Sequence, residues 1–114
     1  MPGTTQARLE GDPSMLIQKR RSELQTIAEK ISEIESDADE HRLVIKTLAD
    51  VYEKEPERTC FRLIGGVLVE RTVKDVLETL QTTLDGFTKV IVELVKQYKT
   101  KEEELTALQR ESTQ

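Results

Sequence analysis

A short apolar segment between two long heptad repeats most constrains how this chain folds. The segment runs from Arg58 to Thr72, is bounded by charge on each side and has Gly65-Gly66 at its centre. A glycine pair supplies the two positive-φ residues that a two-residue primed turn requires. The sequence therefore predicts a β-hairpin over about residues 58–70, with a helix before it and a helix after it.

Both faces of the predicted hairpin are largely apolar. Counting outward from the turn places Ile64 opposite Val67 and Leu63 opposite Leu68. A single layer of the same chain cannot cover both faces, and an isolated hairpin is marginal in water with both outer edges unpaired. We expect the hairpin to complete a sheet or barrel shared between subunits; the alternative is a hairpin folded back on its own helices. The residues assigned to subunit assembly are Phe61, Leu63, Ile64, Gly65, Gly66, Val67, Leu68 and Val69.

The segments that flank the hairpin carry heptad patterns. Apolar residues follow alternating steps of three and four from Ile17 to Tyr52, apart from one skipped site at Arg20, and again from Val73 to Leu108. Spacing sustained in this way is typical of coiled coils.

The ends of the two helices have recognisable signals. Pro13 suits a first helical position, and the first helix is expected to stop before Pro56. The second helix opens at Thr72, with Asp75 as its capping partner. The expected helices span about residues 13–54 and about residues 72–110, each about 60 Å long at 1.5 Å per residue.

Two helices of equal length joined by a short hairpin can pair antiparallel within one chain. If Leu48 lies level with Leu77, all core pairs have position numbers that sum to 125, and Ala38 meets Phe87. Matching the smallest core residue with the largest keeps the helix spacing nearly constant, whereas a parallel homodimer would stack each residue on its own copy. We therefore expect an intrachain antiparallel coiled coil. The expected seam consists of Ile31, Ile34, Ala38, Ile45, Leu48, Leu77, Leu80, Leu84, Phe87, Ile91 and Leu94.

Composition agrees with a mainly α-helical protein without a large core. The 114 residues are 34% charged and 4% aromatic and include no Trp, which suits a seam but no globular core. The net charge of −5 argues against nucleic acid as a partner, and no apolar run approaches the roughly 20 residues of a membrane span. We expect a soluble cytoplasmic protein with one domain over residues 12–110 and disordered tails at 1–11 and 111–114.

No catalytic constellation can be assembled from this sequence. His41 is the only histidine and Cys60 the only cysteine, so neither a metal site nor a Cys-His dyad is expected. His41 occupies a core heptad position and is expected to be a polar seam residue. Gly65-Gly66 lacks the lysine and the helix spacing of a phosphate-binding loop. We expect no enzyme activity, no cofactor and no metal.

Three motifs carry a resemblance to a known family. They run from Asp39 to Leu48, from Thr59 to Arg62 and from Gly65 to Lys74. Together these segments resemble the β-type subunits of prefoldin, which have one hairpin where the α-type has two. The resemblance is specific from about Asp39 to Leu80 and is limited to the heptad pattern in the outer helices.

The resemblance implies a place in a heterohexamer and a chaperone function. Prefoldin contains two α-type and four β-type subunits, so the implied partners are two α-type and three further β-type subunits. Their hairpins form a double β-barrel platform from which the coiled coils extend. The family captures unfolded chains, notably actin and tubulin, without ATP and passes them to the cytosolic group II chaperonin.

Independent support for client binding comes from the outer ends of the two helices. Arg20 and Lys101 occupy core positions there, which weakens the seam and predicts splayed ends with accessible apolar groups. The alternatives are a frayed start of the heptad seam and, for the whole chain, a structural coiled-coil adaptor that bridges two defined partners. The expected client-binding tip residues are Met15, Leu16, Ile17, Leu105 and Leu108.

Overall fold

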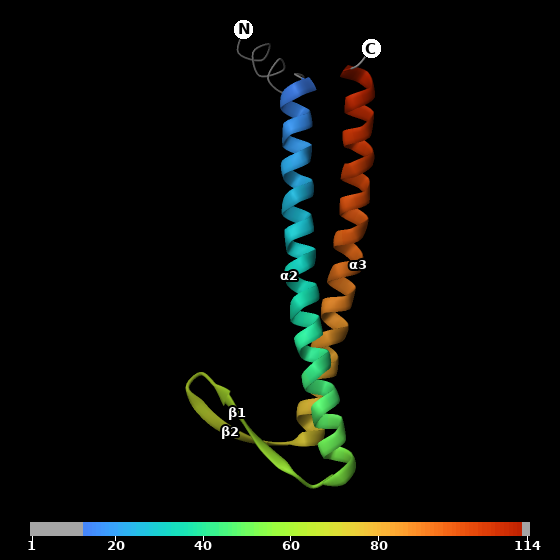
Figure 1. Ribbon diagram of the computed structural model, residues 1–114. Helices are drawn as coiled ribbons and strands as arrows, with labels where there is room; N and C mark the ends of the chain where they lie inside the picture. Colours follow the sequence, from blue (N-terminus) through green and yellow to red (C-terminus); the bar gives the residue numbers. More distant parts are fainter. Residues whose placement is uncertain (1–12, 113–114) are drawn as a thin grey trace. The chain divides into compact units, whose positions relative to one another are not determined.

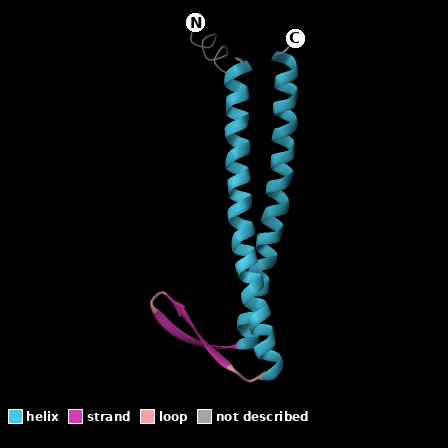
Figure 2. Ribbon diagram, viewed as in Figure 1, coloured by secondary structure: helices cyan, strands magenta, loops and turns pink. Residues whose placement is uncertain are grey.

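The computed structural model describes residues 13–112 and contains two long helices with one hairpin between them (Figures 1 and 2). The elements in chain order are α2 (Pro13–Lys54), β1 (Thr59–Ile64), β2 (Val67–Thr72) and α3 (Val73–Ser112). This is the mainly helical fold with a single hairpin that the sequence predicts. The described residues form two compact units, named here the terminal unit (residues 13–33 and 91–112) and the hairpin unit (Ile34–Val90).

The helix bounds lie close to those expected from the sequence, with one difference at the end of α3. The helix includes Glu111 and ends at Ser112 rather than at about residue 110, because no glycine or proline interrupts the chain there. The expected tail at 1–11, and residues 113–114 of the other expected tail, lie outside the described residues.

Pro56 ends α2 and starts the turn into β1. The amide N of Glu55 donates a final helical hydrogen bond to Val51 O (2.7 Å), and the residue before a proline is then pushed away from helical angles. Arg58 N donates to Glu55 O (3.0 Å) and closes a four-residue turn with Pro56 at its second position. The fixed φ of proline suits that position, so the turn leads the chain directly from α2 into β1.

The two strands pair antiparallel in the predicted register, from Ile64 opposite Val67 at the turn to Thr59 opposite Thr72 at the base. Gly65 and Gly66 have φ values of +55° and +82°. An L residue with a Cβ atom adopts such angles at a cost of about 1–2 kcal/mol, so both turn positions favour glycine. The length of this two-residue turn sets the register of every cross-strand pair.

The strand β2 passes without a loop into α3. Thr72 is the last residue of β2, and its Oγ1 accepts a hydrogen bond from Asp75 N (3.1 Å), as an N-cap does. Val73 N donates to Arg58 O (3.0 Å), and the Val73 side chain is only 1% exposed. These contacts fix the first turn of α3 to the base of the hairpin, and they explain why β2 extends to Thr72 rather than to about residue 70.

The helix segments of the hairpin unit pack around a small residue. Ala38 is completely buried, while the ring of Phe87 meets His41 edge to face, with ring centroids 5.0 Å apart and an interplanar angle of 86°. The sequence register places Ala38 level with Phe87, and the structure adds His41 as the ring that Phe87 meets. Helical side chains lean toward the N-terminus of their own helix, so in an antiparallel pair the Phe87 ring leans toward higher-numbered residues of α2.

The helix segments of the terminal unit run antiparallel. Two ion pairs join them, Glu23 with Lys101 and Arg20 with Glu104, and in both the position numbers sum to 124. A constant sum means that numbers rise along one helix as they fall along the other, and 124 lies one residue from the predicted register. The most buried side chains of this unit are Leu24 and Ile27.

Replacing Gly86 by Ala should stabilise the chain, whereas the same change at Gly65 should destabilise it. Gly86 lies inside α3, and a Cβ atom there would have no atom within 4 Å, so the change gains the helix propensity of alanine, about 1 kcal/mol. Gly65 has positive φ, and alanine there costs about 1–2 kcal/mol. Urea unfolding followed by circular dichroism measures the stability of the Gly86→Ala variant. Hydrogen exchange of the hairpin amides measures the stability of the Gly65→Ala variant. A loss of stability in Gly86→Ala would contradict the open environment of this glycine.

Candidate functional site

The hairpin presents apolar side chains on both of its faces. On one face Phe61, Leu63 and Leu68 are 66–68% exposed, and on the other Ile64 and Val67 are 48% and 62% exposed. Neither helix covers these residues, which argues against the alternative of a hairpin folded back on its own chain. Such a cluster of large exposed apolar groups on a small protein marks an interaction surface.

The register makes this surface continuous. Leu63 and Leu68 are direct cross-strand partners, and Phe61 lies two residues along the same face of β1, opposite Glu70. Val69 is half-buried. Within residues 13–112 the sheet consists only of β1 and β2, so the outer edge of each strand has unused backbone donors and acceptors. The predicted assembly residues thus come together as an apolar, two-edged surface around the Gly65-Gly66 turn.

The predicted seam residues all face inward to some degree. Ile34 and Ala38 are buried, and the others are half-buried. A pair of helices has no third layer to cover its flanks, so half-burial is the normal state of a two-helix seam. The half-buried seam residues are Ile31, Ile45, Leu48, Leu77, Leu80, Leu84, Phe87, Ile91 and Leu94.

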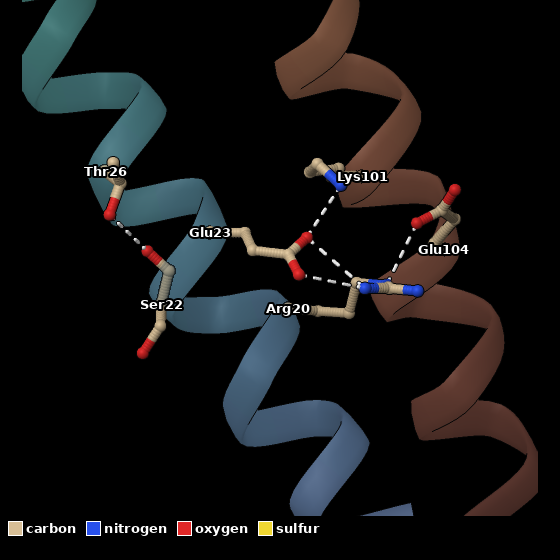
Figure 3. A network of polar contacts seen from close by, with 6 residues as sticks. All are labelled: Arg20, Ser22, Glu23, Thr26, Lys101 and Glu104. Atoms are coloured by element: carbon tan, nitrogen blue, oxygen red, sulfur yellow. Dashed lines mark hydrogen bonds and ion pairs between the residues drawn. The ribbon is translucent and has the colours of Figure 1, made fainter. Parts of the chain in front are cut away.

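Four charged side chains of the terminal unit form what we call the charge cluster: Arg20, Glu23, Lys101 and Glu104 (Figure 3). The Lys101 Nζ lies 2.7 Å from Glu23 Oε2, and Arg20 Nη1 donates to Glu23 Oε1 at 3.1 Å. The Arg20 Nε lies 3.0 Å from Glu104 Oε2, but its N–H does not point at that oxygen, so this contact is an ion pair without a hydrogen bond. Glu23 therefore receives two cations, one from each helix.

The cations of the charge cluster keep Glu23 ionised. The hydrogen bond from Lys101, with the positive charges of Lys101, Arg20 and Lys19, lowers the pKa of the Glu23 carboxyl from its ordinary value of 4.5, against an opposing effect of burial. The structure adds partners for two residues that the sequence places at core positions. Arg20 and Lys101 each meet a carboxylate of the opposite helix, so they bridge the helices, and the splaying of the helix ends stays a prediction.

Sequence reasoning missed Glu23 and Glu104 as partners of these cations. The signal was present, because in the antiparallel register each carboxylate falls within one position of the basic residue on the opposite helix. The heptad pattern of one helix does not contain it, because the pattern carries no information about the opposite helix.

The predicted tip residues lie beyond the charge cluster, toward the first residues of α2 and the last residues of α3. Met15 is 50% exposed. The remaining four are half-buried, so the helix ends cover them only in part: Leu16, Ile17, Leu105 and Leu108. On the other side of the cluster, Ala28, Ile31, Val95 and Tyr98 line an apolar hollow of about 230 Å³, which the heptad analysis did not identify.

The lone histidine and the lone cysteine belong to no metal-binding group in the described part of the chain. Among residues 13–112 no group of three or more His, Cys, Asp and Glu side chains could hold a metal ion. His41 donates from Nδ1 to Asp37 O (3.0 Å) and meets Phe87 edge to face, which makes it a seam residue. Cys60 is half-buried in β1. Neither α2 nor α3 has a stretch that is apolar and long enough to pass through a bilayer.

Comparison with known proteins identifies the family. The family model described as prefoldin subunit matches residues 15–114. The chain is 46% identical over 92 residues to the probable prefoldin subunit 2 of Schizosaccharomyces pombe, covering 81% of this chain and 78% of that protein. It is 45% identical over 85 residues to the human prefoldin subunit 2 and 41% identical over 87 residues to that of Arabidopsis thaliana, covering 75% and 76% of this chain.

The chain spans 53% of the human relative and 57% of the Arabidopsis relative. Prefoldin subunits are co-chaperones rather than enzymes, in agreement with the interpretation of the sequence as non-enzymatic. The matching family model, the identity to subunits of this kind and the single exposed hairpin between two long helices lead to one conclusion: the chain belongs to the prefoldin subunit family.

Proposed function

We propose that this chain is a β-type subunit of a cytoplasmic prefoldin hexamer that captures unfolded polypeptides without ATP and transfers them to the group II chaperonin. The observation that carries the proposal is the hairpin surface, where Phe61, Leu63 and Leu68 are about two-thirds exposed. The hexamer comprises two α-type and four β-type subunits, and the clients are unfolded actin and tubulin.

Burial of the hairpin supplies the free energy of assembly. Burying a large apolar side chain is worth about 1.5–3 kcal/mol, so covering the exposed hairpin residues is worth about 5–10 kcal/mol before the entropic cost of association. The free edges of β1 and β2 add backbone hydrogen bonds to neighbouring strands, which makes strand pairing between subunits the economical way to cover both faces.

Capture of unfolded chains fits the terminal unit. Its partly covered apolar residues offer shallow contacts, which bind an unfolded chain by mass action and need no nucleotide. Several such ends acting together raise the affinity through effective concentration. A coiled-coil adaptor, in contrast, needs one defined surface for one folded partner and has no use for partly covered apolar ends.

Size-exclusion chromatography with light scattering tests the assembly state. We expect the chain alone to be a monomer or a weak, ill-defined oligomer, because its hairpin lacks complementary strands, and we expect it to enter a hexamer only when α-type partners are added. A stable parallel homodimer would contradict the intrachain pairing of the helices.

Replacing Leu68 by Asp should abolish assembly without loss of helix. The change places a charge in a surface that becomes buried, at a cost of several kcal/mol when no partner charge is present. Co-purification with the other subunits measures assembly, and circular dichroism measures helix content. Leu43→Asp is a matched control, because Leu43 has the same 67% exposure but lies on α2, so this variant should assemble normally. Unchanged co-purification of Leu68→Asp would exclude the hairpin as the assembly surface.

Replacing the tip residues Met15, Leu16, Leu105 and Leu108 by Ser should weaken client capture but leave assembly intact. Each lost side chain removes up to about 1.5–3 kcal/mol of contact with a client, so we expect at least about tenfold weaker affinity. Matching changes in the neighbouring subunits prevent them from masking the defect, and light scattering of diluted denatured actin measures capture.

The control for the tip variant changes Leu43, Val44, Val90 and Val92 to Ser, because these exposed apolar residues lie outside the tip. Full suppression of actin aggregation by the tip variant would exclude the tip residues as the site of client capture. A hexamer that ignores denatured chains but saturates with one folded partner would identify the chain as an adaptor instead.

A further inference from the structure

The charge cluster divides the apolar residues of the terminal unit into two groups. Leu24 and Ile27, on the inner side, are only 9% exposed. On the outer side the tip residues Met15, Leu16, Ile17, Leu105 and Leu108 are half-buried or exposed. The cross-helix ion pairs of the cluster lie between the well-covered seam and these poorly covered ends.

The ion pairs of the charge cluster are partly exposed to solvent, and such pairs break readily. The side chains of Arg20 and Glu23 are 25% exposed, that of Lys101 is 32% exposed and that of Glu104 is 45% exposed. Ion pairs in contact with solvent shift an equilibrium only about two- to fivefold each, and salt screens them. Apolar side chains at the same core positions would hold the helices together more firmly and without salt dependence.

We propose that the charge cluster is a latch that holds the ends of α2 and α3 together and opens when its ion pairs are screened or displaced, exposing the tip residues for binding. That the exposed residues bind an unfolded chain rests on the proposed function. The latch itself rests on the cross-helix contacts of Glu23 with Lys101 and of Arg20 with Glu104.

Glu23 is the central group of the latch, and its charge environment determines which condition opens it. It interacts with Lys19 and Arg20 on its own helix and with Lys101 on the opposite helix, where Glu104 pairs with Arg20. Because the pKa of Glu23 is lowered from 4.5, its stabilising contribution is fully present above pH 4.5 and is lost as the pH falls through the lowered value. Near neutral pH, ionic strength and competing charges therefore control the latch, and protonation does not.

The test measures the separation of the helix ends. Spin labels are attached at Gln18→Cys and Thr106→Cys, two exposed positions, in a Cys60→Ser background, and the labelled chain is assembled with its partner subunits before measurement. At low salt we expect a short, narrow distance distribution, and at about 1 M salt, where the Debye length is about 3 Å, a longer and broader one. Glu23→Gln should shift the closed-to-open ratio about two- to fivefold toward open already at low salt.

Three further variants make the result specific. Glu33→Gln removes an ion pair with Lys30 within α2 and should leave the distance unchanged. Exchanging all four charges, with Arg20→Glu, Glu23→Arg, Lys101→Glu and Glu104→Lys, should restore closure and its salt dependence. Arg20→Leu combined with Lys101→Leu should stay closed at every salt concentration and should capture less denatured actin at low salt.

The distance and capture measurements separate the latch from the proposed function. A wild-type distance that does not respond to salt, or a Glu23→Gln distribution equal to that of Glu33→Gln, overturns the latch even if the assembly still suppresses aggregation. Ends that open as expected without any suppression of aggregation support the latch and overturn the client-binding function. The salt titration of the unmutated cluster tests the latch by itself, so the proposal remains testable even if a variant loses helix content.

Discussion

Most apolar side chains of the β1–β2 hairpin are exposed within the described part of the chain, and this constraint organises the rest of the structure. Pro56 starts the turn from α2, Gly65 and Gly66 reverse the chain, and Thr72 and Val73 tie the returning strand to α3. All these features present two apolar faces and two free strand edges from a short segment. A surface of this kind is stable in water only when other strands cover it, which fits a subunit of a larger assembly.

The pairing of the helices is limited by burial, because a two-helix seam has few positions at which a side chain can be fully buried. Only Leu24, Ile27, Ile34, Ala38 and Val73 reach nearly complete burial among the apolar side chains of the described residues. A thin seam has little stability to spare, so charged residues at core positions have a large influence on whether the helix ends stay together. Arg20 and Lys101 remain compatible with the seam because Glu23 and Glu104 neutralise them across the helices.

The hairpin surface and the charge cluster depend on two kinds of contact that respond differently to salt. Apolar burial at the hairpin is insensitive to salt, whereas the ion pairs of the terminal unit are partly exposed and are screened by it. Under the proposed function, assembly through the hairpin and client contact at the tip residues respond differently to the same change in ionic strength. The family to which the chain belongs is one of co-chaperones.

Local rules were sufficient to predict most of the fold. The Gly65-Gly66 turn implied the strand register, Pro13 and Pro56 marked the bounds of α2, and Thr72 marked the start of α3, because each signal acts within a few residues of the backbone. The heptad spacing also predicted which face of each helix turns inward. The exposure of the hairpin followed from its two apolar faces, since no single layer of the chain can cover both.

Local rules could not predict the contacts between side chains on different helices. The sequence by itself determined the two helices, the hairpin, its register and the charged residues at core positions, because these depend on periodicity and on local backbone preferences. Only the tertiary structure decided that the Phe87 ring meets the His41 ring and that Glu23 joins Arg20 to Lys101. The physical reason is that such contacts depend on the direction in which a side chain leaves its helix and on how far it reaches, and the spacing of residues along one helix does not contain either quantity.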